Sequence, residues 1–363
     1  MKYAWKEILY GKKKYILIEL LMILLMFMVL FLSGLASGLG RAVSSAIDTM
    51  NADYFIVDDS AEQLITVSSV GTQVLDELRS AGANAAPLDI QRMYIIKDGD
   101  DEKLNMTYFA IEAGSFIEPE TIEGTGLAAS SADDPILLDD DYKLEGISLG
   151  DTLRDSSTDI EFTVAGFVDD RMYGHTSVGY ITTDGYTRLR KALNPMYVQS
   201  YHAIAVRGSS DYDFAGNGLE LVSKHEIIEN IPSYSAEHLT ITMIVWVLVI
   251  ISAVIIGIFN YILTLQKQKQ FGVMKAVGMR NGELAGIVIS EVLIISVFAA
   301  AVSLVLTFAM AAAIPEKMPF YLEASDAVAV TAAFVAISVL SSMLSVVNIS
   351  RIDPVKAIGG GEE

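Results

Sequence analysis

The sequence of 363 residues predicts an α-helical membrane protein with four transmembrane helices and a large α+β extracellular domain inserted between helices 1 and 2. Three observations lead to this prediction. Four apolar runs are long enough to cross a bilayer, because about 20 apolar residues in a helix span the hydrocarbon core. Lysine and arginine gather beside particular ends of these runs, and the long insert between the first two runs is polar and acidic.

The N-terminal region combines a basic segment with the first apolar run. Residues 1–14 are expected to form a cytoplasmic amphipathic segment, and residues 15–39 the first span, interrupted only by Glu19. A secretory signal is the alternative, because Lys12, Lys13 and Lys14 precede the run. The run is longer than the roughly 7–15 apolar residues of a signal peptide, and Ala36-Ser37-Gly38 is a poor cleavage site. An uncleaved first span is therefore expected.

The insert, residues 40–238, carries 35 acidic and 13 basic residues, a net charge of −22. We interpret this negative charge as keeping an exposed domain soluble rather than as binding cations. The acidic clusters Asp98–Glu102 and Asp139–Asp141 are interpreted as turns, because neither fits a calcium-binding loop. The chain has no cysteine, so disulfides are excluded and the domain must be held by packing. At about 200 residues it is large enough to bury a core.

Strand-like and helix-like segments alternate within the insert, which predicts the α+β class. Segments rich in β-branched and aromatic residues are expected to be strands at 53–57, 92–97, 103–112, 160–168 and 201–206. Helices are expected at 72–82, where Gly82 is a plausible end, and at 183–193. Residues 41–50 are expected to continue the first span outward as a helical stalk.

Three further spans follow the insert. They are predicted at 239–265, 284–314 and 327–348, with a short extracellular loop at 315–326 and a cytoplasmic tail at 349–363. Basic residues concentrate in the N-terminal segment, between the second and third spans, and in the tail. Because positive residues favour the cytoplasmic side, both termini are placed inside and the insert outside, in the cell membrane.

The segment at 266–283 contains four basic residues and a short apolar face between two spans. A short amphipathic helix at the cytoplasmic membrane surface could receive a push from a bound partner. It could equally be an anchor in the lipid interface. The residues alone leave these two alternatives open.

Motifs for covalent chemistry are missing from the sequence. We find no phosphate-binding G-x-x-x-x-G-K-[ST] loop, no H-E-x-x-H, no G-x-S-x-G and no protein-kinase set. The four histidines show no metal-ligand spacing. The chain is therefore not expected to be an enzyme, to hold an intrinsic cofactor or to bind nucleic acid.

The architecture and two motifs resemble the MacB/FtsX-type permeases of ATP-binding cassette (ABC) systems. "FGVMKAVGMRNGEL" (Phe271–Leu284) is similar to the coupling segment of that family, although Gln270 stands where an acidic residue is common. "ISRIDPVKAI" (Ile349–Ile358) is similar to its closing signature. The resemblance implies a homodimer working with two copies of a separate cytoplasmic ATPase that binds ATP and magnesium. It assigns ATPase coupling to Phe271, Gly272, Val273, Met274, Lys275, Ala276, Val277 and Gly278.

The N-terminus is similar to one branch of that family. The stretch "MKYAWKEILYGKKKYILIELLMILLMFMVLFLSGLASGLG" resembles the HrtB-type heme-efflux permeases of Gram-positive bacteria. What this resemblance implies is the export of surplus heme, taken laterally from the membrane. Heme would then be the transported ligand.

The residues permit a heme site at the outer mouth of the first two spans. Iron accepts His, Met or carboxylate ligands, and the propionates need cations. The candidates there are Arg41, Met50, Glu237, His238 and Met243, and deeper alternatives are Met22, Met26 and Met28. Packing in lipid or protein is the more common role of a single methionine.

Three functions remain open at this point. The chain could export heme, or export another amphipathic cargo such as a peptide or lipid. It could instead transmit ATP-driven movement to an extracellular partner without any transport. The third alternative predicts a docking surface on the inserted domain and no ligand between the spans.

Overall fold

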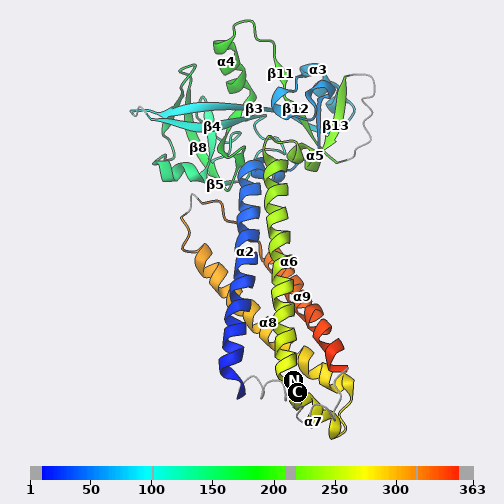
Figure 1. Ribbon diagram of the computed structural model, residues 1–363. Helices are drawn as coiled ribbons and strands as arrows, with labels where there is room; N and C mark the ends of the chain where they lie inside the picture. The colour runs from blue at the N-terminus through cyan, green and yellow to red at the C-terminus, as the bar shows by residue number, and fades with distance from the viewer. Residues whose placement is uncertain (1–9, 100–101, 209–217, 316–317, 351–363) are drawn as a thin grey trace. The chain divides into compact units, whose positions relative to one another are not determined.

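The computed structural model describes residues 10–99, 102–208, 218–315 and 318–350 (Figure 1). Residues 1–9 of the N-terminal segment, Lys317 and residues 351–358 of the closing signature lie outside the described residues. The chain divides into two compact units. We call residues 1–39 with 238–363 the helical unit, and residues 40–237 the inserted domain.

Four long helices have the length and composition to cross a membrane: α2 (Lys12–Asp48), α6 (Tyr234–Gln266), α8 (Asn281–Ala311) and α9 (Ala324–Ser350). A short helix, α7 (Gln268–Ala276), lies between α6 and α8 in the chain. The long helices continue beyond the apolar runs at several ends, most clearly in α2. Apolar residues mark what lipid can surround, whereas a helix continues while its backbone hydrogen bonds are made.

The core of the helical unit joins α2 to α6, α8 and α9. Met26 and Leu30 of α2 are fully buried there, together with Ile256, Ile295 and Phe334. Two glycines of α2 permit residues 319 and 320 to approach the helix closely. A Cβ atom at Gly34 would collide with the Phe320 ring, and one at Gly38 would collide with the backbone of residue 319. The small residues at the end of the first span therefore admit the segment after α8.

One large mixed sheet organises the inserted domain (Figure 1). Its strands run in the order β13-β1-β12-β3-β4-β10-β6-β8-β5, with β7 and β9 pairing beside this path. The bounds are β1 Tyr54–Asp58, β3 Asn84–Lys97, β4 Lys103–Ile111, β5 Thr121–Gly124, β6 Pro135–Asp139, β7 Thr152–Asp155, β8 Glu161–Val168, β9 Met172–Tyr173, β10 Thr176–Thr182, β12 Ala203–Arg207 and β13 Leu219–Ser223. Short strands β2 (Val70–Gly71) and β11 (Ser200–Tyr201) form a second pair. Helices α3 (Thr72–Ser80), α4 (Thr183–Leu193) and α5 (Lys224–Glu229) complete the domain.

The predicted α+β class is confirmed, and so are the helices at α3 and α4; β3 and β4 pair as an antiparallel hairpin. Two strand predictions were wrong in extent. β3 begins at Asn84 rather than residue 92, because Pro87 is tolerated inside the strand although proline usually ends one. The segment at 201–206 is split at His202 into β11 and β12.

A carboxyl group and an imidazole lie buried together in this domain. Asp89 in β3 accepts a hydrogen bond from the His202 backbone N–H at 3.0 Å, and the Ile90 N–H donates to His202 Nδ1 at 3.0 Å. Burial raises the pKa of Asp89 from 3.8 to about 7. Burial, followed by the charge of Arg190, lowers the pKa of His202 from 6.5 to about 4.

Replacing Asp89 by Asn is expected to change the pH dependence of stability. Between pH about 4 and 7 the folded protein holds a proton on Asp89 that the unfolded chain has lost, so this group's contribution falls as pH rises. One proton corresponds to at most about 1.4 kcal/mol per pH unit. The His202 contribution runs in the opposite direction and is common to both proteins. Thermal unfolding followed by near-UV circular dichroism between pH 4.5 and 6.5 should show stability rising with pH in Asp89→Asn, where only the His202 contribution remains, and a flatter dependence in the wild type, where the two contributions offset. An equal pH dependence in the two proteins would contradict the assignment.

Candidate functional site

A single residue separates α6 from α7. Lys267 has φ −93° and ψ 1°, outside both helices. Its N–H donates to Leu263 O and Thr264 O at 3.2 Å each, and its carbonyl accepts from the Phe271 N–H at 2.9 Å. The chain therefore changes direction at Lys267 without losing backbone hydrogen bonds.

The inner face of α7 packs against α8. Phe271 is fully buried and forms a small core with Leu284 and Val288, and Met274 and Met279 pack beside it. This placement changes the prediction for Phe271. Its ring lies inside the helical unit, where it holds α7 on α8, and is not exposed to a partner.

The end of α7 explains the glycine of the motif. Gly278 has φ +104°, a conformation that favours glycine. Its N–H donates to Lys275 O, and the Met279 N–H donates to Met274 O, both at 3.0 Å. This pattern is a Schellman motif, which ends a helix at a left-handed residue. Gly278 thus fixes the turn from α7 towards α8.

The opposite side of α7 is open. Val273 is 51% exposed and Val277 82% exposed. The residues exposed on and just after α7, which we call the α7 outer face, are Gln268, Lys269, Gln270, Val273, Ala276, Val277, Gly278 and Arg280. Of the eight predicted coupling residues, Phe271 and Gly272 are buried, Met274 and Lys275 are half-buried, and the other four are exposed. An apolar patch with basic edges is a surface suited to another protein.

A buried ion pair lies at the junction of α6 and α7. Lys267 Nζ lies 2.6 Å from Glu291 Oε2 of α8 and donates to the Tyr15 hydroxyl of α2 at 2.7 Å. All three residues are less than 10% exposed. The Glu291 carboxylate and the Tyr15 hydroxyl thus meet at one ammonium group, which joins α2 and α8 to the end of α6.

Loop 170–175 of the inserted domain is hydrogen-bonded to residues 41–45, where that domain begins. Asp170 pairs with Arg41, whose Nε donates to Asp170 Oδ2 at 2.7 Å. Three further hydrogen bonds of 2.9 Å run from the Met172 N–H to Ser45 Oγ, from the Gly174 N–H to Val43 O and from the His175 N–H to Ala42 O. His175 Nε2 also lies 3.1 Å from Glu237 Oε2. Loop 170–175 therefore contacts both the end of α2 and the start of α6.

The predicted heme ligands fall into three environments. Arg41 and Glu237 take part in the contacts of loop 170–175. Met50 is only 5% exposed in the core of the inserted domain, and this burial disfavours the predicted heme contact. His238 and Met243 belong to the helical unit, and Met243 is 60% exposed. The deeper alternatives also divide, because Met22 and Met26 are buried in the helix core whereas Met28 is partly exposed.

A pocket of about 480 Å³ lies beside loop 170–175 in the inserted domain. Its lining includes Arg92, Tyr173 and His175 among apolar residues such as Ile90 and Ile231. The combination of cationic and apolar groups suits an amphipathic anion.

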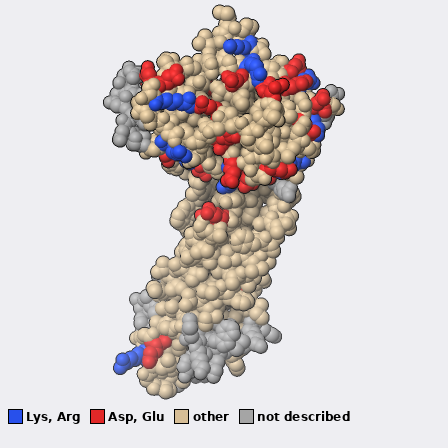
Figure 2. All heavy atoms as spheres, turned by 180° about the vertical axis from the view of Figure 1, so that it is seen from behind, with Lys and Arg blue, Asp and Glu red and all other residues tan. Residues whose placement is uncertain are grey.

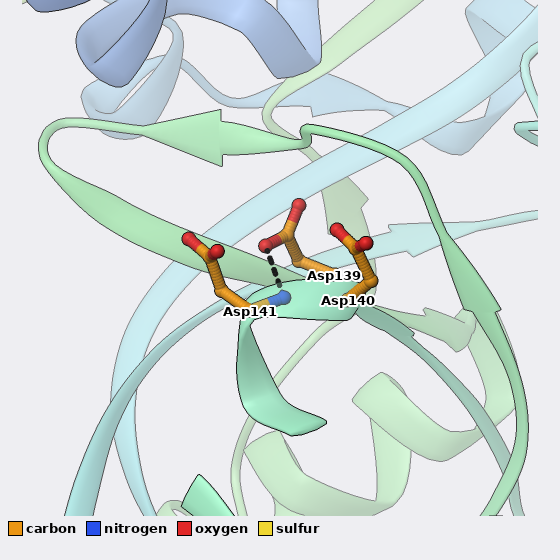
Figure 3. Close-up of side chains that lie close together, drawn as sticks. All are labelled: Asp139, Asp140 and Asp141. Atoms are coloured by element: carbon orange, nitrogen blue, oxygen red, sulfur yellow. Dashed lines mark hydrogen bonds between the residues drawn. The ribbon is translucent and has the colours of Figure 1, made fainter. Parts of the chain in front are cut away.

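The acidic cluster Asp139, Asp140 and Asp141 lies at the end of β6 (Figure 3). Asp139 accepts hydrogen bonds from the Arg171 N–H and, at 3.2 Å, from the Asp141 N–H. Burial raises the pKa of Asp139 to about 7. Asp139 thus caps the short helix that follows, in agreement with the interpretation of this cluster as a turn.

Charge separates the two units clearly. Figure 2 shows acidic and basic side chains over the inserted domain, whereas the described residues on the visible face of the long helices carry almost none. Four apolar membrane-length helices, with an α+β domain between the first two and a short helix between the second and third, indicate a polytopic membrane protein.

Comparison with known proteins agrees with this class. Residues 242–354, which include α7 and α8, match the FtsX-like permease C-terminal family, so this part of the chain is similar to FtsX-like permeases. The whole chain is 25% identical over 364 residues to the "Putative hemin transport system permease protein HrtB" of Staphylococcus haemolyticus and 26% identical to that of Staphylococcus epidermidis. Both alignments cover all of this chain and all of the relative.

One solved structure is similar in part. The extracellular domain of the noncanonic ABC-type transporter YknZ from Gram-positive bacteria aligns with 44% of this chain and 84% of its own, at 14% identity and a TM-score of 0.31.

Several residues of the site could not be found from the sequence. Lys267 was grouped with the other basic residues between the spans, and Asp170 and His175 were not singled out. Lys267 alone carried a usable signal. It directly follows the apolar run of α6, and Glu291 is the only acidic residue of the next run.

Proposed function

We propose that the chain is the membrane subunit of an ABC efflux system that exports heme, using ATP hydrolysed by a separate cytoplasmic ATPase. The observation that carries this proposal is the full-length similarity to hemin transport permeases, because it extends over both units rather than over the FtsX-like region alone. Heme is then the substrate.

The proposed assembly is a homodimer with two ATPase copies at the cytoplasmic face. Lysine and arginine near the ends of the spans favour cytoplasmic termini and an extracellular inserted domain. In that orientation α7 lies on the cytoplasmic side. Its outer face offers Val273 and Val277 to the ATPase, with Lys269 and Arg280 at the edges.

The proposed heme site uses residues at the outer ends of the first two predicted spans. Heme has an apolar ring and two carboxylates, so a cation next to an exposed soft ligand suits it. Arg41, Glu237, His238 and Met243 remain the candidates, and His175 joins them because it contacts Glu237. Arg41 is already paired with Asp170, so a propionate would have to replace that carboxylate.

An absorption spectrum tests the proposal. Purified protein in detergent should shift the Soret band of added hemin with a saturable stoichiometry. Empty detergent micelles and an unrelated four-helix membrane protein are the controls, because hemin partitions into micelles unaided. A spectrum identical to that of the micelles would contradict heme binding.

Transmission of movement to an extracellular partner is the second candidate. It is favoured by loop 170–175, which within the inserted domain holds together the residues that follow the first span and those that precede the second. This candidate predicts ATP-dependent change in the inserted domain with no Soret shift.

A further inference from the structure

Three polar side chains, which we call the polar set, are buried in the helical unit, where desolvation of charged groups is unfavourable: Tyr15, Lys267 and Glu291. Charged groups near the membrane interior are expensive, and a buried ion pair seldom stabilises more than well-packed apolar residues of similar volume. A small cavity beside Lys267 and Glu291 is also lined by the polar side chains of Asn260 and Thr264. Stability alone therefore gives no reason for choosing these residues here.

The polar set fixes the orientation of α7 relative to the neighbouring helices. An ammonium group has three donors, and two of them go to acceptors on different helices, Tyr15 on α2 and Glu291 on α8. Lys267 is also the one residue between α6 and α7. Its side chain therefore fixes the point about which α7 would turn relative to α6. The neighbouring Phe271 core holds α7 against α8 but does not constrain direction in the same way.

We propose that Lys267, held by Glu291 and Tyr15, is a positioning residue that transmits movement of α7 to α2 and α8 during ATP-driven transport. This inference rests on the proposed coupling role of α7. A push on the α7 outer face turns α7 about Lys267, and the ion pair carries that displacement to α8 and, through the tyrosine, to α2. With apolar residues at these positions α7 can slip, so hydrolysis no longer moves the outer ends of the spans.

The test uses a variant that removes both charges together. Lys267→Met combined with Glu291→Leu leaves no unpaired buried charge and should fold, whereas either single change would strand its partner. Lys267→Arg is the matched control, since it keeps the charge. Each protein is reconstituted with its ATPase, and hemin transported per ATP hydrolysed is measured in proteoliposomes.

The ratio of hemin transported to ATP hydrolysed should fall at least about tenfold in the double variant, while Lys267→Arg should retain at least half of the wild-type ratio. A double variant with the wild-type ratio would overturn the proposal.

A second measurement needs neither hemin nor ATPase. Because the chain has no cysteine, Val277→Cys gives a single site for a nitroxide label. Its electron paramagnetic resonance spectrum should report greater mobility of α7 in the double variant than with Lys267 and Glu291 intact. An unchanged spectrum would also count against the proposal.

The outcomes separate this inference from the proposed function. If charges placed on the α7 outer face leave transport intact, the coupling role itself is wrong. If they abolish transport while Lys267→Met/Glu291→Leu retains the full ratio, coupling through α7 stands and only the joint is refuted.

Discussion

Replacing Val273 and Val277 together by Asp should abolish co-purification of the ATPase and all ATP-driven transport. Both side chains are exposed on α7, and the loss of an apolar anchor from an interface commonly costs about 2 kcal/mol or more. One such anchor corresponds to roughly a 30-fold weaker affinity, since 1.4 kcal/mol is a factor of ten. Two adjacent carboxylates should exceed this loss. Affinity purification through the permease, followed by quantification of bound ATPase, is the measurement.

The control for that prediction is Val198→Asp. Val198 has the same 82% exposure as Val277 but lies in the inserted domain. It should leave ATPase binding unchanged, because a charge on a solvated valine does not by itself harm the protein. If the α7 variant binds ATPase as well as the Val198 variant does, α7 is an interfacial anchor and not a docking helix.

Phe271→Asp would not be informative in the same way. The Phe271 ring is buried against Leu284 and Val288, so a carboxylate there would be placed in an apolar core. The expected result is local unfolding of α7, for a reason unrelated to the ATPase.

Changing Arg41, Glu237, His238 and Met243 together to Ala should weaken hemin binding at least tenfold and remove any hemin resistance conferred by the transporter. These side chains supply the cation and the iron ligands proposed for heme. Hemin titration followed by the Soret band measures the first effect, and growth in hemin measures the second.

Two control proteins sharpen this prediction. Asp170→Asn breaks the ion pair with Arg41 but leaves the cation, so hemin binding should persist or strengthen. Met22→Leu with Met26→Leu changes only methionines buried in the helix core and should bind hemin normally. If the quadruple variant binds hemin like the wild type, the site at the helix ends is refuted, and Met28 becomes the next candidate because it is partly exposed.

The membrane helices could be predicted from composition because lipid demands long apolar runs whatever the tertiary contacts. The sheet could be predicted only in part. β10 pairs in parallel with β4, and β6 pairs in parallel with β8. The strands of each pair are far apart in the sequence, so no local pattern predicts the pairing. Gly179 and Pro135 also weaken the local strand signal of β10 and β6, and neither strand was predicted.

The candidate site shows the same division between local and distant information. The sequence motif predicted α7. Gly278 at the end of α7 is explained locally, because this residue has the left-handed backbone conformation that favours glycine. The burial of Phe271 depends on α8, and the ion pair joins residues 15, 267 and 291 from three helices. No periodicity in one segment reports such contacts.

Transport in proteoliposomes tests the central claim most directly. The permease and its ATPase are reconstituted with the ATPase facing outward, hemin is supplied in the membrane, and an apo-heme protein trapped in the lumen reports its arrival. With ATP and magnesium, lumenal heme should accumulate well above the level seen without ATP, and the Val273→Asp/Val277→Asp variant should show no ATP-dependent accumulation. Equal accumulation with and without ATP, in vesicles whose ATPase is active, would contradict heme export by this permease.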